Sequence, residues 1–230
     1  MRIVKTVPVR DGLAKWGRVL SEHVARLADV DLNVELVEVP GVDRDEIIGL
    51  QDCDAIASTH AAFVRRLFAR PDPPDAISLG CLLEPGLEEL DGVRQVVTGE
   101  IEASIRLLAG PYRPIGFVAS SSVGAEALGE RIERHGLASC VAAIRSITAD
   151  PLDFTDEHAE EDLATAMSTE VRLLGASGVT QVVGYGSARL LTEVTRRTGI
   201  PTHSPITASL RMTAAALAAT SVATGRRVTR

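Results

Sequence analysis

Aromatic residues are scarce in this sequence: Phe, Tyr and Trp make up only 3% of its 230 residues. A surface that stacks the bases of single-stranded nucleic acid needs several exposed rings. The charge also has the wrong sign for a phosphate backbone, because 31 acidic residues outnumber 24 Lys and Arg and give a net charge of -7. Three C-terminal arginines, Arg226, Arg227 and Arg230, are interpreted as a solvated tail. We therefore expect no nucleic-acid partner.

Cysteine is also rare, and long apolar runs are absent. The three cysteines are Cys53, Cys81 and Cys140. A secreted disulfide framework has an even number of closely spaced cysteines, so we expect reduced thiols in the cytoplasm. Residues 1–8 lack the apolar segment of a signal peptide. The apolar stretch 206–222 is rich in Ala and Thr and contains Arg211, which predicts a packed helix and no membrane partner.

The sequence contains no pattern for a metal or a nucleotide. The five histidines are His23, His60, His135, His158 and His203. None of them is four residues from another, the spacing that places two zinc ligands on one helical face. Gly184-Tyr185-Gly186 begins like a dinucleotide fingerprint, but Arg189 occupies the position of its third glycine. We expect no metal and no cofactor.

Short β-branched runs alternate with stretches of helical periodicity, and 45% of the residues are apolar. This alternation is typical of parallel sheets covered by helices, so an α/β fold is predicted. The predicted strands cover residues 3–9, 34–39, 75–79, 115–119, 141–147 and 179–183. The predicted helices cover residues 13–27, 61–68, 124–134, 160–174, 189–197 and 206–222. Another helix is expected to begin near Pro85, because proline is favoured at a first helical position.

Two strand ends share a spacing. Gly80 and Gly184 each follow a predicted strand, and each precedes a Leu by seven residues and a Glu by nine. The match favours two pseudosymmetric lobes, each a mostly parallel sheet flanked by helices and each presenting one residue at the carboxyl end of a strand. We expect the first lobe to comprise residues 1–98 and 206–230, and the second lobe residues 99–205. Open α/β sheets bind ligands at the carboxyl ends of their strands, so the residues after these glycines are candidates for the site.

Cys81 lies directly after a predicted buried strand and just before the helix expected near Pro85. The amides and the dipole of a helix N-terminus stabilise a thiolate, so a cysteine there can be unusually acidic. The alternative is that Cys81 is a small buried apolar residue, the common state of a free cysteine. Cys53 and Cys140 lack this setting and are interpreted as structural.

Three consecutive hydroxyl residues, Ser120, Ser121 and Ser122, lie between the predicted strand 115–119 and the following helix. Their hydroxyls and the amides after them can hold a carboxylate or an imide oxygen. An ordinary helix N-cap is the alternative interpretation.

The segment 75–87, Asp-Ala-Ile-Ser-Leu-Gly-Cys-Leu-Leu-Glu-Pro-Gly-Leu, resembles the first cysteine motif of hydantoin and allantoin racemases. Residues 96–97 with 102–104, residues 117–120, and residues 182–185 with 199–201 resemble further segments of these enzymes. The chain therefore resembles the aspartate/glutamate/hydantoin racemase superfamily over most of its length.

This resemblance implies a cofactor-independent enzyme, with a homo-oligomer as the expected assembly. In the family, two cysteines face each other across a cleft; one thiolate removes the proton next to a carbonyl and the other thiol reprotonates the opposite face. Cys81 matches the first position, whereas Tyr185 stands at the second. The family's Asn-Pro-Asn-Thr segment is replaced at 7–10, where Arg10 is either a partner for a substrate carboxylate or a surface residue. The expected substrate contacts are Arg10, Leu82, Ser120, Ser121, Gly184 and Gly186.

Three functions remain open at this stage. The first is an isomerase of the racemase or epimerase type, acting on a small amino-acid derivative, a hydantoin-like ring or a carboxylate, with Cys81 as base or nucleophile and Tyr185 as the opposite acid or an oxyanion donor. The second is a single-cysteine decarboxylase or lyase, similar in logic to the arylmalonate decarboxylases. The third is a non-catalytic protein that binds a small molecule.

Overall fold

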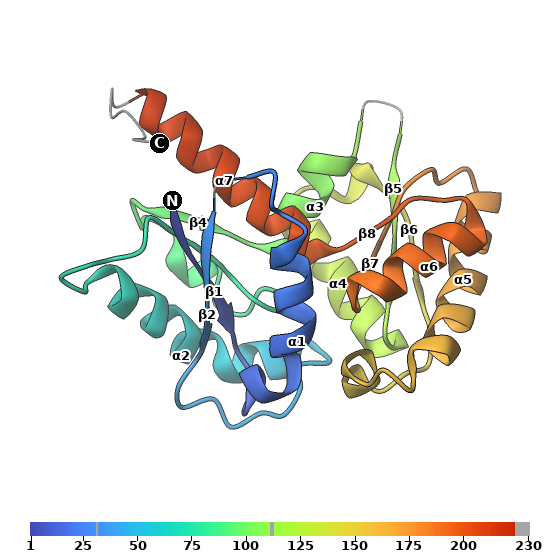
Figure 1. Cartoon of the computed structure of the whole chain (residues 1–230), viewed down its shortest axis with the longest axis horizontal. Coiled ribbons are helices and arrows are strands. Elements are labelled where there is room, and N and C mark those ends of the chain that lie inside the picture. Colours follow the sequence, from blue (N-terminus) through green and yellow to red (C-terminus); the bar gives the residue numbers. More distant parts are fainter. Residues whose placement is uncertain (31, 111–112, 224–230) are drawn as a thin grey trace.

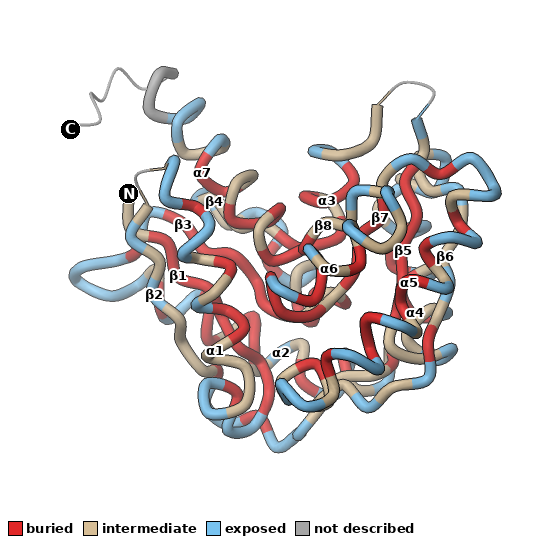
Figure 2. The backbone as a smooth tube through the Cα atoms, turned by 45° about the vertical axis from the view of Figure 1, so that its right-hand side comes forward, coloured by how far each residue is buried: buried red, intermediate tan, exposed pale blue. Residues whose placement is uncertain are grey.

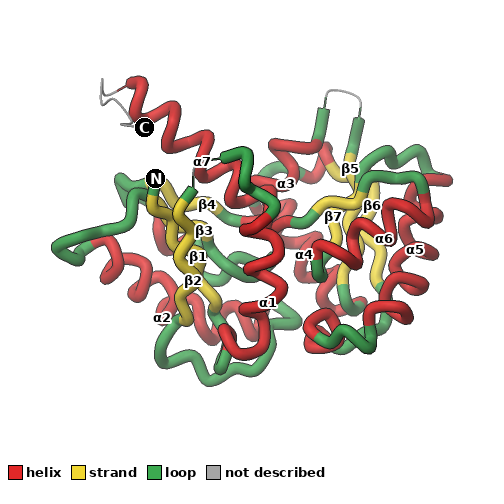
Figure 3. Tube along the Cα trace, in the orientation of Figure 1, coloured by secondary structure: helices red, strands yellow, loops and turns green. Residues whose placement is uncertain are grey.

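The computed structural model describes residues 1–30, 32–110 and 113–223 of the chain. The C-terminal arginines Arg226, Arg227 and Arg230, and with them the end of the expected first lobe, lie outside the described residues. Within the described ranges the chain forms two four-stranded, all-parallel sheets that lie side by side (Figure 1). Figure 3 shows helices on either side of each set of strands.

The first sheet has the strand order β2-β1-β3-β4. Its strands are β1 (Arg2–Val7), β2 (Asn33–Glu38), β3 (Ala76–Ser78) and β4 (Val96–Thr98). Its helices are α1 (Gly12–Ala25), α2 (Leu50–Phe68) and the C-terminal α7 (Pro205–Ala223), which returns from the second lobe to pack against β3 and β4. One face of the sheet packs on α2, and the other packs on α1 and α7.

The second sheet repeats the order as β6-β5-β7-β8. Its strands are β5 (Ile115–Ala119), β6 (Val141–Ser146), β7 (Val182–Gly184) and β8 (Thr202–His203). Its helices are α3 (Glu100–Leu108), α4 (Ser122–Arg134), α5 (Glu160–Ala176) and α6 (Ala188–Thr198). Alternation along β5 sends Ile115 and Phe117 toward α3 and α4, and Val118 toward α5 and α6.

The repeated strand order confirms the predicted α/β architecture of two lobes. In both sheets the first two strands are joined by a helix, and the chain then crosses to the other side of the first strand. β3 and β7 therefore occupy equivalent places, and so do the residues that follow them. The central strands are buried (Figure 2), which explains why their sequences are nearly continuous apolar runs.

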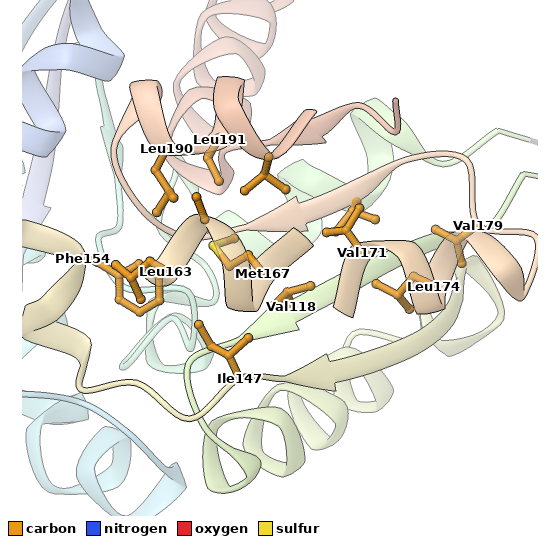
Figure 4. Close-up of a cluster of buried hydrophobic side chains, with 13 residues drawn as sticks. Val118, Ile147, Phe154, Leu163, Met167, Val171, Leu174, Val179, Leu190 and Leu191 are labelled. Carbon is orange, nitrogen blue, oxygen red and sulfur yellow. The ribbon is translucent and has the colours of Figure 1, made fainter. Parts of the chain in front are cut away.

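Side chains from distant segments fill the core of the second lobe. Val118, Met167 and Val171 meet Leu190 and Leu191 between the sheet and its outer helices (Figure 4). Burial of a Leu, Val or Met side chain contributes about 1.5–3 kcal/mol each, so this cluster is a main source of stability. None of the described helices has the length and apolar character needed to span a bilayer.

Most predicted elements are confirmed with shifted ends, but the helix near Pro85 is wrong. The chain forms turns after β3 and then only a short 3-10 helix, η1 (Glu88–Leu90). Cys81, Glu84 and Gly86 have positive φ values of 72, 53 and 82°. Left-handed residues at this spacing cannot belong to a right-handed helix. A Cβ at Gly86 would lie 2.4 Å from the Ala57 carbonyl oxygen, so α2 passes close enough that only glycine fits there.

A buried lysine joins the elements of the first lobe. Lys5 points from β1 into the apolar layer below α7, and its side chain is fully buried. Its Nζ donates to Glu100 Oε1 at 2.5 Å, to the Leu79 carbonyl at 2.7 Å, and to the hydroxyls of Ser78 and Ser209 at 3.2 Å each. One ammonium group therefore ties β1 to β3, α3 and α7.

Replacing Lys5 with Met should destabilise the protein by about 3–5 kcal/mol at neutral pH, because Glu100 would stay buried without its cation. The loss should shrink as the pH falls, since the raised pKa of Glu100 makes the carboxyl neutral in the folded protein at a higher pH than in the unfolded chain. Urea unfolding of Lys5→Met at several pH values measures both effects.

The matched control is Arg106→Met, which breaks the exposed ion pair of Arg106 with Glu102 and should change stability by about 0–1 kcal/mol. Equal losses in the two variants, or a Lys5→Met loss that does not depend on pH, would show that the buried pair does not have this role.

Candidate active site

The carboxyl ends of the central strands of both sheets meet in one cavity of about 130 Å³. In each sheet this is the point where the strand order reverses, and such points form ligand crevices. The cavity is lined from the first lobe by Thr6, Val7, Pro8, Val9, Trp16, Leu20, Glu46, Ile47, Ile48, Gly80, Cys81, Leu82 and Leu83. The second lobe contributes Val118, Ala119, Ser120, Gly124, Pro151, Phe154 and Tyr185.

Cys81 is presented to the cavity by a tight turn. The amide of Gly80 donates to Thr6 Oγ1 at 3.0 Å, and His60 Nε2 lies 2.8 Å from the same oxygen. A Cβ on Gly80 would lie 1.9 Å from the Thr6 carbonyl oxygen, so only glycine fits there. Cys81 then takes a left-handed conformation with φ 72°, a strained state that surrounding contacts must hold in place.

Glu84 supplies one of those contacts. Its buried carboxylate accepts the amide of Ile101 at 2.6 Å, at the start of α3, and its second oxygen lies 2.7 Å from His135 Nε2 at the end of α4. The pKa of His135 is raised, chiefly by this hydrogen bond to Glu84. The turn that carries Cys81 is thus anchored to the second lobe.

Tyr185 enters the cavity from the equivalent turn after β7. Its ring packs edge-on against Trp16 of α1, with centroids 5.4 Å apart and an interplanar angle of 80°. Such T-shaped pairs are favourable beyond their buried area. The Tyr185 hydroxyl makes no hydrogen bond with a residue that the structure describes, which leaves it available to a molecule in the cavity.

Burial keeps both groups neutral. It raises the pKa of the Cys81 thiol well above its ordinary value near 9, and the Leu83 amide opposes this only in part. Burial also raises the pKa of Tyr185 well above 10, and negative charge on Glu100 or Cys81 raises it further. The expected acidic Cys81 at a helix N-terminus is therefore corrected: the helix is absent and burial dominates.

The two serines predicted to contact substrate have different positions. Ser120 lines the cavity at the end of β5. The hydroxyl of Ser121 accepts the amide of Gly124 at 3.0 Å and caps α4, which is the alternative interpretation of this segment. Only Ser120 is placed to contact a molecule in the cavity.

Four of the eight predicted site residues line the cavity: Cys81, Leu82, Ser120 and Tyr185. Arg10 lies outside the lining and is half-exposed, with its guanidinium paired to Asp43 and Asp45. Gly184 is buried within β7. Gly186 is not part of the cavity lining, and its carbonyl accepts a hydrogen bond from His23. The carboxylate-binding alternative for Arg10 is replaced by its interpretation as a surface residue.

Several lining residues were missed from the sequence. Glu46 brings the only carboxylate among the lining residues, and burial together with Asp150 raises its pKa. It lies in an irregular segment without periodicity, so no local signal marked it. Trp16 was assigned only to a helix, although an aromatic residue beside a strand end is a reasonable candidate for a cavity wall.

The arrangement holds two neutral acids, a thiol and a phenol, on different lobes of one mostly apolar cavity. Such a pair can donate protons to a carbanion or enolate, and the thiol acts as a base once it ionises. Among the described residues no group of three His, Cys, Asp or Glu side chains is arranged to hold a metal ion. Cys53 is buried in α2, where burial raises its pKa to about 11, in line with a structural thiol.

No family model and no curated protein matches the chain in sequence, but solved structures do match its fold. The allantoin racemase of Pseudomonas fluorescens superposes with a TM-score of 0.78 at 19% identity, covering 100% of this chain and 94% of that one. The allantoin racemase of Klebsiella pneumoniae gives 0.78 at 20% identity, covering 100% and 90%. Unliganded arylmalonate decarboxylase gives 0.59 at 19% identity, covering 94% and 92%.

Alkylation of Cys81 by iodoacetamide should be slow at neutral pH and should keep rising by about tenfold per pH unit to beyond pH 9, because only the thiolate reacts. Mass spectrometry of the alkylated peptides measures the rate, with the partly buried Cys140 as internal reference and Cys81→Ser as the blank. A rate that levels off below pH 8 would contradict a thiol whose pKa is raised by burial.

Proposed function

Because the chain has the fold of the aspartate/glutamate/hydantoin racemase superfamily, we propose that it is a cofactor-independent isomerase of the racemase or epimerase type. Cys81 moves the proton on the carbon next to a carbonyl, and Tyr185 serves the opposite face. One observation carries this proposal: Cys81 and Tyr185 follow equivalent strands of the two lobes and line the same cavity.

The proton transfer has two steps. The Cys81 thiolate takes the proton from the α-carbon, and the electron pair of that bond passes to the carbonyl oxygen, which gives a planar enolate. The Tyr185 hydroxyl then donates its proton to the other face of the carbon, which inverts the configuration. Solvent reprotonates the resulting phenolate, and the Cys81 thiol releases the proton it took to solvent, which restores the thiolate. Ser120 is the hydroxyl in the lining placed to donate to the enolate oxygen.

The lining favours an uncharged substrate. No Lys or Arg is among the described lining residues, and Glu46 brings the only carboxylate there. A carboxylate in this cavity would lose its hydration without gaining a cation, which is costly. A hydantoin-like ring has polar imide groups but no full charge, so it fits this cavity better than an amino-acid carboxylate.

A decarboxylase is the second candidate, and the neutral thiol favours it. Loss of carbon dioxide from a malonate-type substrate leaves the electron pair on the α-carbon, and a protonated thiol then delivers one proton to one face. This reaction needs the protonated form of Cys81, which is the form that burial stabilises. Such a substrate is itself an anion, and a cavity without a cation binds it poorly.

The isomerase is tested with enantiopure 5-benzylhydantoin in heavy water. Wild-type protein should invert the substrate and introduce deuterium at the α-carbon, with a rate that rises at alkaline pH as the thiolate forms. Cys81→Ser should lose about 10²–10⁴-fold in both inversion and exchange. Tyr185→Phe should keep the exchange but lose the inversion, because the Cys81 thiol exchanges its proton with the heavy water and returns a deuteron to the face that the proton left. Chiral chromatography and proton NMR measure the two processes.

Cys140→Ser is the control, since this cysteine does not line the cavity. Phenylmalonate is tested in parallel. Carbon dioxide release that depends on Cys81, is constant below pH 9 and has no accompanying α-proton exchange would replace the isomerase with the decarboxylase. Absence of any Cys81-dependent reaction on either probe would count against both.

A further inference from the structure

A second cavity, of about 570 Å³, shares no lining residue with the cavity of Cys81. Its walls come from the end of α1, from α3 and α6, and from the segment that runs from β8 into α7. Both lobes therefore contribute to it. Its polar groups include His23, Arg26, His203 and Ser204, and no Asp or Glu is among its described lining residues.

Arg26 gives this cavity an uncompensated positive charge. Its Nη1 donates to Thr192 Oγ1 at 3.0 Å, a contact that holds the α1 end against α6. Among the described residues, no carboxylate lies within 4 Å of this guanidinium. The other lining arginine, Arg211, is satisfied by Asp29, with both distances 3.0 Å. A guanidinium with spare donors is well suited to carboxylate and phosphate oxygens.

The segment that runs from β8 into α7 contributes two further polar residues, His203 and Ser204, to the lining of this cavity. His203 Nε2 is buried and has no hydrogen-bond partner among the described residues. The hydroxyl oxygen of Ser204 accepts the amide of Ile206 at 3.2 Å, which leaves its proton free to be donated.

We propose that this cavity binds a small anion with a carboxylate or phosphate group. Arg26 supplies the charge, and the hydroxyl of Ser204 supplies a hydrogen bond. The absence of acidic side chains from the described lining removes the repulsion that such an anion would otherwise meet. This second site is distinct from the catalytic cavity, and its existence does not depend on the reaction that Cys81 performs.

The second cavity is connected to the catalytic one through His23. The imidazole Nε2 donates to the carbonyl of Gly186 at 2.8 Å, and Nδ1 accepts the Thr207 hydroxyl at 3.2 Å. Gly186 directly follows Tyr185, and Thr207 lines the second cavity. An anion that moves Thr207 or Arg26 therefore acts on the backbone that positions the phenol. We infer that occupancy of this site adjusts the position of Tyr185.

The fluorescence of Trp16 reports on this connection. Trp16 is the only tryptophan, and its indole packs on the Tyr185 ring. Inorganic phosphate and succinate are titrated as separate probes, with calorimetry for affinity, Trp16 fluorescence for coupling, and sodium chloride as the ionic-strength control. Binding of either probe to the wild-type protein is expected, together with a change in fluorescence, and the probe that binds identifies phosphate or carboxylate chemistry.

Four variants locate the binding and test its connection to Tyr185. Arg26→Gln should weaken it by at least about tenfold, whereas Arg70→Gln removes the same charge from an exposed site after α2 and should leave it unchanged. Cys81→Ser should also leave it unchanged, because the catalytic cavity is separate. At saturating probe, Thr207→Val should lose most of the fluorescence response, since it breaks the contact with His23.

Three outcomes would overturn the site: neither probe binds to the wild-type protein, Arg26→Gln binds as tightly as Arg70→Gln, or binding is lost in Cys81→Ser. An unchanged fluorescence response in Thr207→Val would refute the connection through His23. None of these outcomes depends on whether the protein racemises or decarboxylates a substrate.

Discussion

The buried ammonium of Lys5 is the constraint on which the first lobe and the turn that carries Cys81 depend. It binds the Leu79 carbonyl, one residue before Gly80, and at the same time holds Glu100 at the start of α3. A cation in an apolar layer is tolerated only when its donors are satisfied. Its partners come from β3, α3 and α7, so these elements must reach their positions together. The hydrogen bond from Lys5 to the Leu79 carbonyl therefore fixes the backbone that leads into the turn of Cys81.

The repeated strand order explains how two dissimilar side chains reach one cavity. In each lobe the strand order reverses next to the first strand, so the third strand ends beside it and leaves a crevice. Cys81 and Tyr185 follow those third strands. The contact of Glu84 with His135 joins the first turn to the second lobe, while Trp16 on α1 contacts Tyr185. Each lobe thus helps to position the functional side chain of the other.

The sequence was informative where local rules decide the outcome. Strand runs, helix periodicity and the paired glycines Gly80 and Gly184 predicted the two-lobed fold and the strand ends that carry the candidate site. Long-range contacts decided the rest. Pro85 indicated a helix start, but the carboxylate of Glu84 is held by the amide of Ile101, which keeps the segment in turns. Arg10 is occupied by acidic residues more than thirty positions away, a pairing that no local pattern shows.

Burial of the thiol does not by itself weaken the proposed chemistry. A raised pKa reduces the fraction of Cys81 that is ionised, but it also makes each thiolate a stronger base toward a carbon acid. The enolate that forms is an anion in the same apolar cavity, so burial disfavours the charge before and after proton transfer alike. The free-energy cost of burying a negative charge is therefore similar for the Cys81 thiolate and for the enolate. Burial consequently changes the free energy of the proton transfer itself only little. What remains is the need for a substrate that enters without its own negative charge, which is the property that a described lining without Lys or Arg selects.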